Sequence, residues 1–211
     1  MPSILSQRAA ARDASARYTR SLELLSAANP TERLAGIYGL EGLLREERGN
    51  EAPLSGAIIE VFSAFVRRHA SPDVLGVSQR LSVDVQAALT ALGRTPDVLA
   101  QLERPLDLHG INLREAYLPR CHFERAFLYD CDFEGALLIG ANLRGAWLSR
   151  ANLTRANLDG ADLRGADLTG ARGLNPSELQ DVQWDETTRW PQPRDFRETF
   201  QPPFEAEWFH A

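Results

Sequence analysis

The residues best suited to chemistry are two cysteines and four histidines, and their spacing gives them no shared site. Cys121 and Cys131 could act as nucleophiles or metal ligands, but either role needs partner side chains that the surrounding sequence does not supply. His122 follows Cys121 directly, and successive side chains of an extended chain point to opposite sides. The other histidines, at 69, 109 and 210, are scattered, and no serine–histidine–acid order appears. We therefore predict a protein that is not an enzyme and needs no cofactor or metal.

Composition narrows the remaining function classes. All 23 basic residues are arginine, and the absence of lysine excludes Schiff-base chemistry and a phosphate-binding loop built on lysine. The 211 residues are 44% hydrophobic, which is typical of a soluble protein of one or two domains. No apolar run approaches the ~18 residues of a membrane span, and the first residues lack the pattern of a signal peptide. We therefore expect a cytoplasmic protein with no membrane span.

The cysteines lie within a regular repeat of five residues that extends from Leu106 to Ala171. A period of five fits neither a strand nor a helix, and it predicts a short extended side followed by a corner. A small residue stands two places before the large one in nearly every unit, so that both point inward, and Cys121 and Cys131 occupy such small positions. Glycine follows two places after the large residue in seven of the thirteen units, as tight turns favour. The large residue, leucine or phenylalanine, recurs at positions 108, 113, 118, 123, 128, 133, 138, 143, 148, 153, 158, 163 and 168.

The run ANLRG AWLSR ANLTR ANLDG ADLRG ADLTG, residues 141–170, resembles the pentapeptide-repeat family, whose pattern is Ala-(Asp/Asn)-Leu-x-x. The resemblance implies a short right-handed, four-sided parallel β-helix with twenty residues in each coil. Coils that stack at the strand spacing of about 4.8 Å would make a short rod that needs a cap at each end. The fold class that we expect is α plus β, with an N-terminal helical module, the β-helix and a C-terminal cap helix. The predicted core of the rod contains Leu128, Phe133, Leu138, Leu143, Leu148, Leu153, Leu158 and Leu163.

The region before the repeats has the patterns of several amphipathic helices. We expect helices within 6–28, 31–48, 54–70 and 83–93, with Ser82 as the N-terminal cap of the last one, and another beginning at Thr95-Pro96-Asp97. The segments RYTRSLELL, RLAGIYGLEGLL and VDVQAALTALGR resemble the helical region that precedes the repeats in many bacterial pentapeptide-repeat proteins. In those proteins the region often follows membrane-spanning helices, and we expect a soluble relative here.

The repeat fails at Gly173, and the following residues predict a different structure. Asn175 and Pro176 have the types that begin a helix, which could close the last coil. The segment QWDETTRWP then resembles the usual closing segment of the family. The tail after it is rich in proline but also in aromatic residues, which is unusual for an inert disordered segment. We therefore divide the chain into a helical module (1–105), the β-helix (106–171), a C-terminal cap (172–190) and an aromatic tail (191–211).

Two opposite sides of the predicted rod carry apolar residues that point outward. One side exposes Phe127, Tyr129 and Trp147, and the opposite side exposes Tyr117, Leu137 and Ile139 together with Pro119. Apolar patches of this kind need a covering partner. The helices could cover one side, with the aromatic tail or a second subunit on the other, or at least one side could bind another protein. We expect a scaffold or protein-binding function, in an unknown pathway, with the aromatic side as the principal surface and a homodimer as one form of partner.

The other two sides are polar, and they bear on an alternative function. Proteins of the family that protect gyrase from quinolones imitate DNA with an acidic rod, which requires a sustained negative surface. Residues 106–171 contain nine acids and seven arginines, whereas 172–211 contain eight acids and four arginines, so most of the net charge of −6 lies outside the rod. We therefore place gyrase protection by DNA mimicry second. We expect no nucleic acid as a partner, because the chain is acidic and has no basic stripe.

Overall fold

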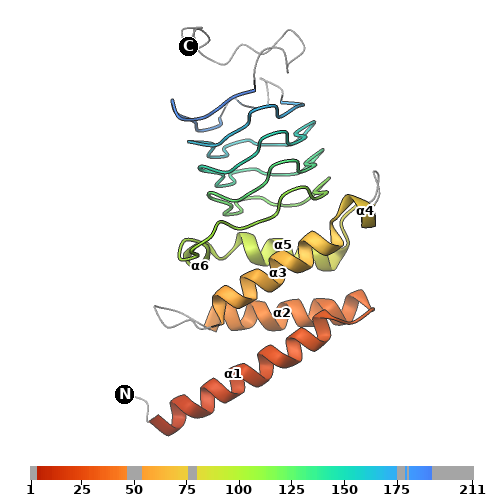
Figure 1. Cartoon of the computed structure of the whole chain (residues 1–211), viewed down its shortest axis with the longest axis vertical. Helices are drawn as coiled ribbons and strands as arrows, with labels where there is room; N and C mark the ends of the chain where they lie inside the picture. The colour runs from red at the N-terminus through yellow and green to blue at the C-terminus, as the bar shows by residue number, and fades with distance from the viewer. Residues whose placement is uncertain (1–3, 47–53, 76–79, 175–178, 180, 192–211) are drawn as a thin grey trace.

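A computed structural model describes residues 4–46, 54–75, 80–174, 179 and 181–191, in which a stack of helices leads into a stack of coils (Figure 1). The helices are α1 (Ile4–Leu25), α2 (Pro30–Glu46), α3 (Ser55–His69), α4 (Pro72–Leu75), α5 (Val83–Gly93) and α6 (Pro96–Leu99). None of the helices in these ranges has the length and apolar character that crossing a membrane requires. The expected helices therefore form, although the one after Thr95 has only four residues.

The helical module is layered from the end of the molecule toward the coils. Helix α1 packs on α2, and the two backbones approach so closely that a Cβ on Gly36 would lie 2.6 Å from the Ser21 carbonyl oxygen. Helices α2 and α3 in turn pack on α5. Asp84, fully buried in the first turn of α5, accepts a 2.5 Å hydrogen bond from Nε of Arg33 in α2. Ser82 stands at the N-terminal cap of α5 but makes no side-chain capping hydrogen bond.

The coils are held together by parallel bridges between residues twenty apart. Phe127 pairs with Asp107 and with Trp147, and the same register is repeated in three further columns. The four columns begin at Asp107, Asn112, Tyr117 and His122, which are five residues apart, so each coil has four sides. Each side is too short for a continuous strand, so the bridges are isolated, and on each side a few backbone hydrogen bonds join one coil to the next.

The interior of the coils is filled by side chains. All eight predicted core residues from Leu128 to Leu163 are at most 1% exposed, and the small residues two places before them, Cys131 and seven alanines, are at most 2% exposed. The corners are uniform: the residue two places after each large one has a positive φ, between 60° and 69° at the seven glycines. Six corners adopt the same conformation without glycine, with φ from 55° to 59°, which L residues rarely adopt. These are Glu115, Arg120, Arg125, Asp130, Arg150 and Arg155.

Helix α3 closes two sides of the first coil. The Asn112 N–H, which has no coil below it, donates to the Ala70 carbonyl at the end of α3 over 2.8 Å. On the preceding side, the Ser63 hydroxyl of α3 donates to the Asp107 carbonyl over 2.7 Å. Helical groups thus replace the missing coil, which matters because unpaired edges of a sheet are open to pairing with another chain.

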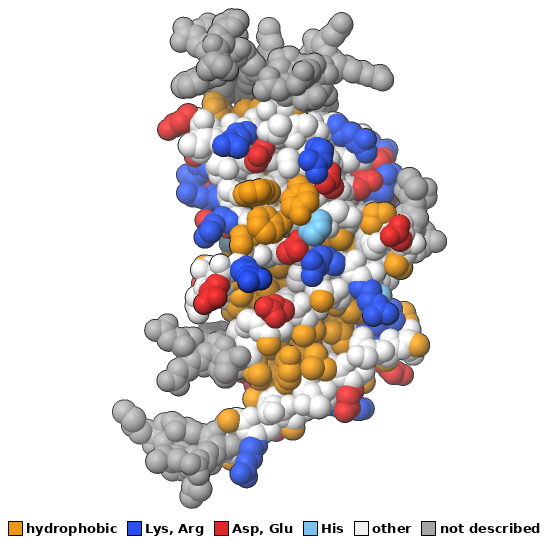
Figure 2. All heavy atoms as spheres, in the orientation of Figure 1, with side chains coloured by type: hydrophobic (Ala, Val, Ile, Leu, Met, Phe, Trp, Pro, Cys, Tyr) orange, Lys and Arg blue, Asp and Glu red, His pale blue; other side chains and the backbone are white. Residues whose placement is uncertain are grey.

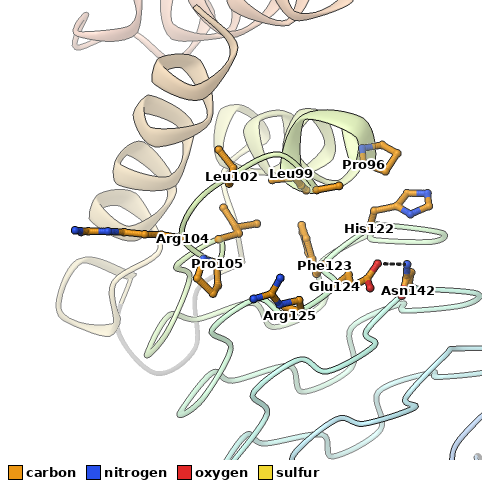
Figure 3. Close-up of a pocket in the computed structure, with 12 residues that line it drawn as sticks. Pro96, Leu99, Leu102, Arg104, Pro105, His122, Phe123, Glu124, Arg125 and Asn142 are labelled. Carbon is orange, nitrogen blue, oxygen red and sulfur yellow. Dashed lines mark hydrogen bonds between the residues drawn. The ribbon is translucent and has the colours of Figure 1, made fainter. Parts of the chain in front are cut away.

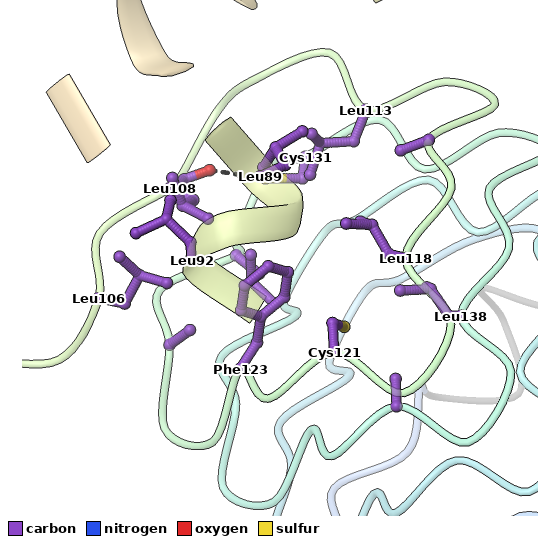
Figure 4. Close-up of a cluster of buried hydrophobic side chains, with 14 of the residues drawn as sticks. Leu89, Leu92, Leu106, Leu108, Leu113, Leu118, Cys121, Phe123, Cys131 and Leu138 are labelled. Carbon is purple, nitrogen blue, oxygen red and sulfur yellow. Dashed lines mark hydrogen bonds between the residues drawn. The ribbon is translucent and has the colours of Figure 1, made fainter. Parts of the chain in front are cut away.

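Helix α5 closes the other two sides. The side-chain amide of Gln86 accepts from the Tyr117 N–H (2.9 Å) and donates to the Tyr117 carbonyl (2.8 Å), as a neighbouring strand would. The His122 N–H donates to the Gly93 carbonyl over 2.9 Å. A Cβ at Gly93 would lie 2.8 Å from Cβ of Cys121, so this close approach requires glycine. Leu89 and Leu92 of α5 fill the open end of the coil (Figure 4).

The helices thus cover the end of the rod, and the alternative in which they cover an apolar side is not what the structure shows. At the other end, coil pairing continues past Ala171, because Asp162 bridges Gln183 and Asp167 bridges Arg189. The helix predicted to begin at Asn175 lies outside the described residues, as does the tail from residue 192 onward.

Candidate functional site: the aromatic wall

One side of the rod carries a continuous group of aromatic rings, which we call the aromatic wall and define as Phe127, Tyr129 and Trp147. Phe127 and Trp147 are bridge partners on successive coils, and their rings meet edge to face with centroids 5.3 Å apart. The Tyr129 ring lies 6.3 Å from that of Phe127 on the same coil. Trp147 is 53% exposed, whereas the other two are half-buried. The structure therefore brings these three candidates together.

His109 extends the aromatic wall toward the helices, and the sequence analysis did not include it. Its ring stacks on that of Tyr129 at 4.7 Å, and its Nδ1 lies 2.5 Å from an Asp107 carboxylate oxygen. Arg67 of α3 binds the other oxygen of Asp107 at 2.7 Å. Burial opposes ionisation of Asp107, but the hydrogen bonds from His109 and the charges of His109 and Arg67 outweigh it and lower its pKa. The face of the coils in Figure 2 shows such a group of hydrophobic side chains beside a histidine.

The surroundings of the aromatic wall are polar and already paired. Arg150 forms an ion pair with Asp130, which stands one coil away at the same corner. The hydrogen bond from Arg150 lowers the pKa of Asp130, so this carboxylate stays charged. Asp167, above Trp147 in the column, accepts the backbone N–H of Thr169. An apolar centre with a polar border is the usual composition of a protein-binding surface.

The second set of candidates lies on a different side of the rod. Tyr117 and Leu137 are bridge partners two columns away from Phe127, and Ile139 follows on the same side. Tyr117 is 61% exposed, Leu137 and Ile139 are 37% and 38% exposed, and Tyr117 has the single aromatic ring among these three residues. The six candidates therefore form two separate surfaces, of which the aromatic wall is the more cohesive.

The cysteines have the environment of core residues. Cys121 and Cys131 are buried and carry free thiols, and burial raises the pKa of each to about 12. A thiol with such a pKa is neither a nucleophile nor a ready metal ligand at neutral pH. The Cys131 thiol donates to the Leu108 carbonyl over 3.0 Å. In the described part of the chain, no group of three or more histidine, cysteine or acidic side chains could hold a metal.

A small pocket lies where α6 and the segment after it meet the first coils (Figure 3). Its volume is about 180 Å³, and Phe123, His122 and Arg125 are among its lining residues. Asn142 donates to Glu124 across one edge at 3.4 Å. The volume is below the roughly 300 Å³ of ordinary ligand pockets, and no pair of side chains there has the arrangement of a base and a nucleophile.

The outward Asn and Asp residues of the repeat serve mainly the local backbone. The side-chain oxygen of each accepts the N–H two residues later, as at Asn112, Asp132 and Asn157. Several acids on the rod also pair with arginine, for example Asp162 with Arg164 at 2.5 Å. The acidic groups are therefore largely occupied by protein donors.

Comparison with known proteins gives a consistent result. The sequence profile of the pentapeptide repeats family matches residues 107–145 and 136–172, with eight copies of the repeat. A pentapeptide repeat protein from Nostoc Pcc 7120 is 32% identical over 42% of this chain and 76% of its own, with a TM-score of 0.25. One from the cyanobacterium Cyanothece 51142 is 36% identical over 43% and 67%, with a TM-score of 0.19.

A third similar structure is a pentapeptide repeat protein from the thylakoid lumen of Arabidopsis thaliana. It is 29% identical over 37% of this chain, with a TM-score of 0.27, and the chain spans 58% of its length. No protein with a curated description matches the chain significantly.

Proposed function

Because the chain belongs to the pentapeptide-repeat family, we propose that it is a non-catalytic binding protein whose protein partner lies against the aromatic wall. The observation that carries this proposal is the mutually packed group of Phe127, Tyr129 and Trp147, in which Trp147 is exposed, at outward positions of the repeat. An exposed group of this kind needs a function to offset its cost in solubility.

The physical properties of the aromatic wall suit it to protein recognition. Tryptophan and tyrosine supply the largest share of the binding energy in many protein interfaces, especially at their centre. The rings stand on a backbone that bridges fix from coil to coil, so binding costs little conformational entropy. The polar border carries both signs of charge, as in the pair of Asp130 and Arg150, which favours a protein surface over a nucleic acid.

The test is affinity capture with the full chain and two single variants. We expect Trp147→Ser to raise the dissociation constant of a captured partner protein by at least about 30-fold, which is the effect of losing one dominant aromatic anchor. Leu137→Ser, on the other exposed side, is the matched control and should leave binding within about threefold. Mass in solution, measured on the same variants, reports whether the partner is a second copy. Equal binding by the wild type and Trp147→Ser would refute the proposal.

Gyrase protection by DNA mimicry is the other function under consideration. The rod offers no sustained negative surface for it, because Asp130, Glu134 and Asp162 are each paired with an arginine. A supercoiling assay with gyrase and a quinolone separates the two functions. We expect no protection by this chain, and protection would reverse their order.

A further inference from the structure

The described chain ends on the side of the rod that bears the aromatic wall. The bridge column that contains Phe127 and Trp147 continues through Asp167 to Arg189, two residues before the last described residue, Pro191. The end of this segment is firmly held: Pro191 is buried, and the Trp190 ring packs edge to face against Trp184 at 6.4 Å. Residues 192–211 therefore start from a fixed point at the top of the side that bears the aromatic rings.

The sequence of residues 192–211, which we call the tail, matches an apolar surface. Four of its aromatic residues recur every fourth position, and a fifth adjoins the last one. They are Phe196, Phe200, Phe204, Trp208 and Phe209. A free segment normally contains few aromatic residues, because it has nothing to bury them against.

The distances allow the tail to reach its own aromatic wall. Coils stack about 4.8 Å apart, so Trp147, two bridges from Arg189, lies roughly 10 Å away along the rod, and Phe127 lies roughly 14 Å away. An extended chain advances about 3.3 Å per residue, so Phe196 comes level with these rings within five residues of Pro191. We propose that the tail of the same chain lies along the aromatic wall and that a partner must displace it.

Docking of the tail does not depend on the proposed function, but its effect on a partner does, because that effect requires a protein that binds the aromatic wall. A short tether gives the tail an effective concentration of about 1 mM at the aromatic wall. A contact with an intrinsic dissociation constant of only about 0.1 mM would then be about 90% formed and would raise the apparent Kd of a partner about tenfold. The docked tail would thus raise the partner concentration that is needed to occupy the aromatic wall.

Disulfide trapping in the full-length chain tests this directly. One cysteine replaces Thr199 in the tail, and the second replaces Arg67 of α3, which is exposed and binds Asp107 at the helical end of the same bridge column. Thr199 is eight residues past Pro191, about 26 Å in an extended chain, and Asp107 is four bridges, or about 19 Å, from Arg189. The matched control pairs Thr199→Cys with Asp159→Cys, which is exposed on the opposite side of the rod. The native cysteines do not interfere, because both are buried.

We expect the pair with Arg67→Cys to form an intramolecular disulfide about tenfold faster than the same pair in a chain that also carries Phe196→Ser and Phe200→Ser. The pair with Asp159→Cys should not respond to these two substitutions. Equal rates with and without the tail aromatics would overturn the proposal, and so would disulfides formed mainly between chains, which would identify a second copy as the occupant. Either failure, with capture still dependent on Trp147, would leave the proposed function intact.

Discussion

Replacing Gln86 by alanine tests whether α5 acts as the missing coil of the rod. The change removes two hydrogen bonds to Tyr117, each worth about 1 kcal/mol at this partly exposed position. The higher helix propensity of alanine stabilises α5 by roughly 0.4 kcal/mol and offsets part of this loss, so the unfolding free energy should fall by about 1.5 kcal/mol. For a chain of 211 residues this lowers the melting temperature by about 3–6 °C.

The assay is thermal unfolding, followed by hydrogen exchange of the Tyr117 amide, which should exchange about tenfold faster in Gln86→Ala. Gln86→Glu should be similarly destabilising, because a carboxylate can accept from the Tyr117 N–H but cannot donate to its carbonyl. Gln101→Ala, an exposed position beyond α6, is the control and should change the unfolding free energy by less than about 0.5 kcal/mol. A Gln86→Ala variant as stable as the control would refute the view that its amide closes this side.

Three further predictions concern the interior. Leu143→Asp buries an unpaired carboxylate and should lower the unfolding free energy by several kcal/mol, whereas Leu137→Asp, on the surface, should have a small effect; a melting temperature near wild type for the former would disprove its inward position. Burial opposes ionisation of Asp84, but the hydrogen bonds from Ser82 and Arg33 and the charge of Arg33 outweigh burial and lower its pKa, so its stabilisation is present at neutral pH and lost as the pH falls below about 4. Denaturation curves against pH should therefore fall less steeply in acid for Asp84→Asn. Cys121 and Cys131, whose pKa values burial raises to about 12, should react with a thiol reagent at pH 8 over 100-fold faster after unfolding in urea, and fast reaction of the native protein would contradict their burial.

The repeat predicted the facing of side chains in the rod because period, residue size and turn chemistry agree there. A small inward residue, a large inward residue and a corner recur in nearly every unit, and the local sequence alone decides which side each takes. The sequence indicated only about half of the corners, because glycine occupies seven of them and other residues occupy six. At Arg120 and Arg150 the stacked neighbours impose the same positive φ on an ordinary residue.

The contacts between helices and rod could not be read from the sequence in the same way. Gln86 and Ser63 look like ordinary polar residues of amphipathic helices, and their partners lie 31 and 44 residues later in the chain. His109 was missed for a different reason: it was judged as a catalytic candidate and not by register. Its position, twenty residues before Tyr129, already places it beside that ring.

The closure of all four sides of the first coil limits how copies of the chain can assemble. A coil with open hydrogen-bonding groups could accept the last coil of another copy, and repeated addition would give a filament. Here Ala70, Gln86 and Gly93 already occupy those groups, so polymerisation through this end would first require α3 and α5 to detach. The helical module thus prevents another copy of the chain from adding to this end of the rod.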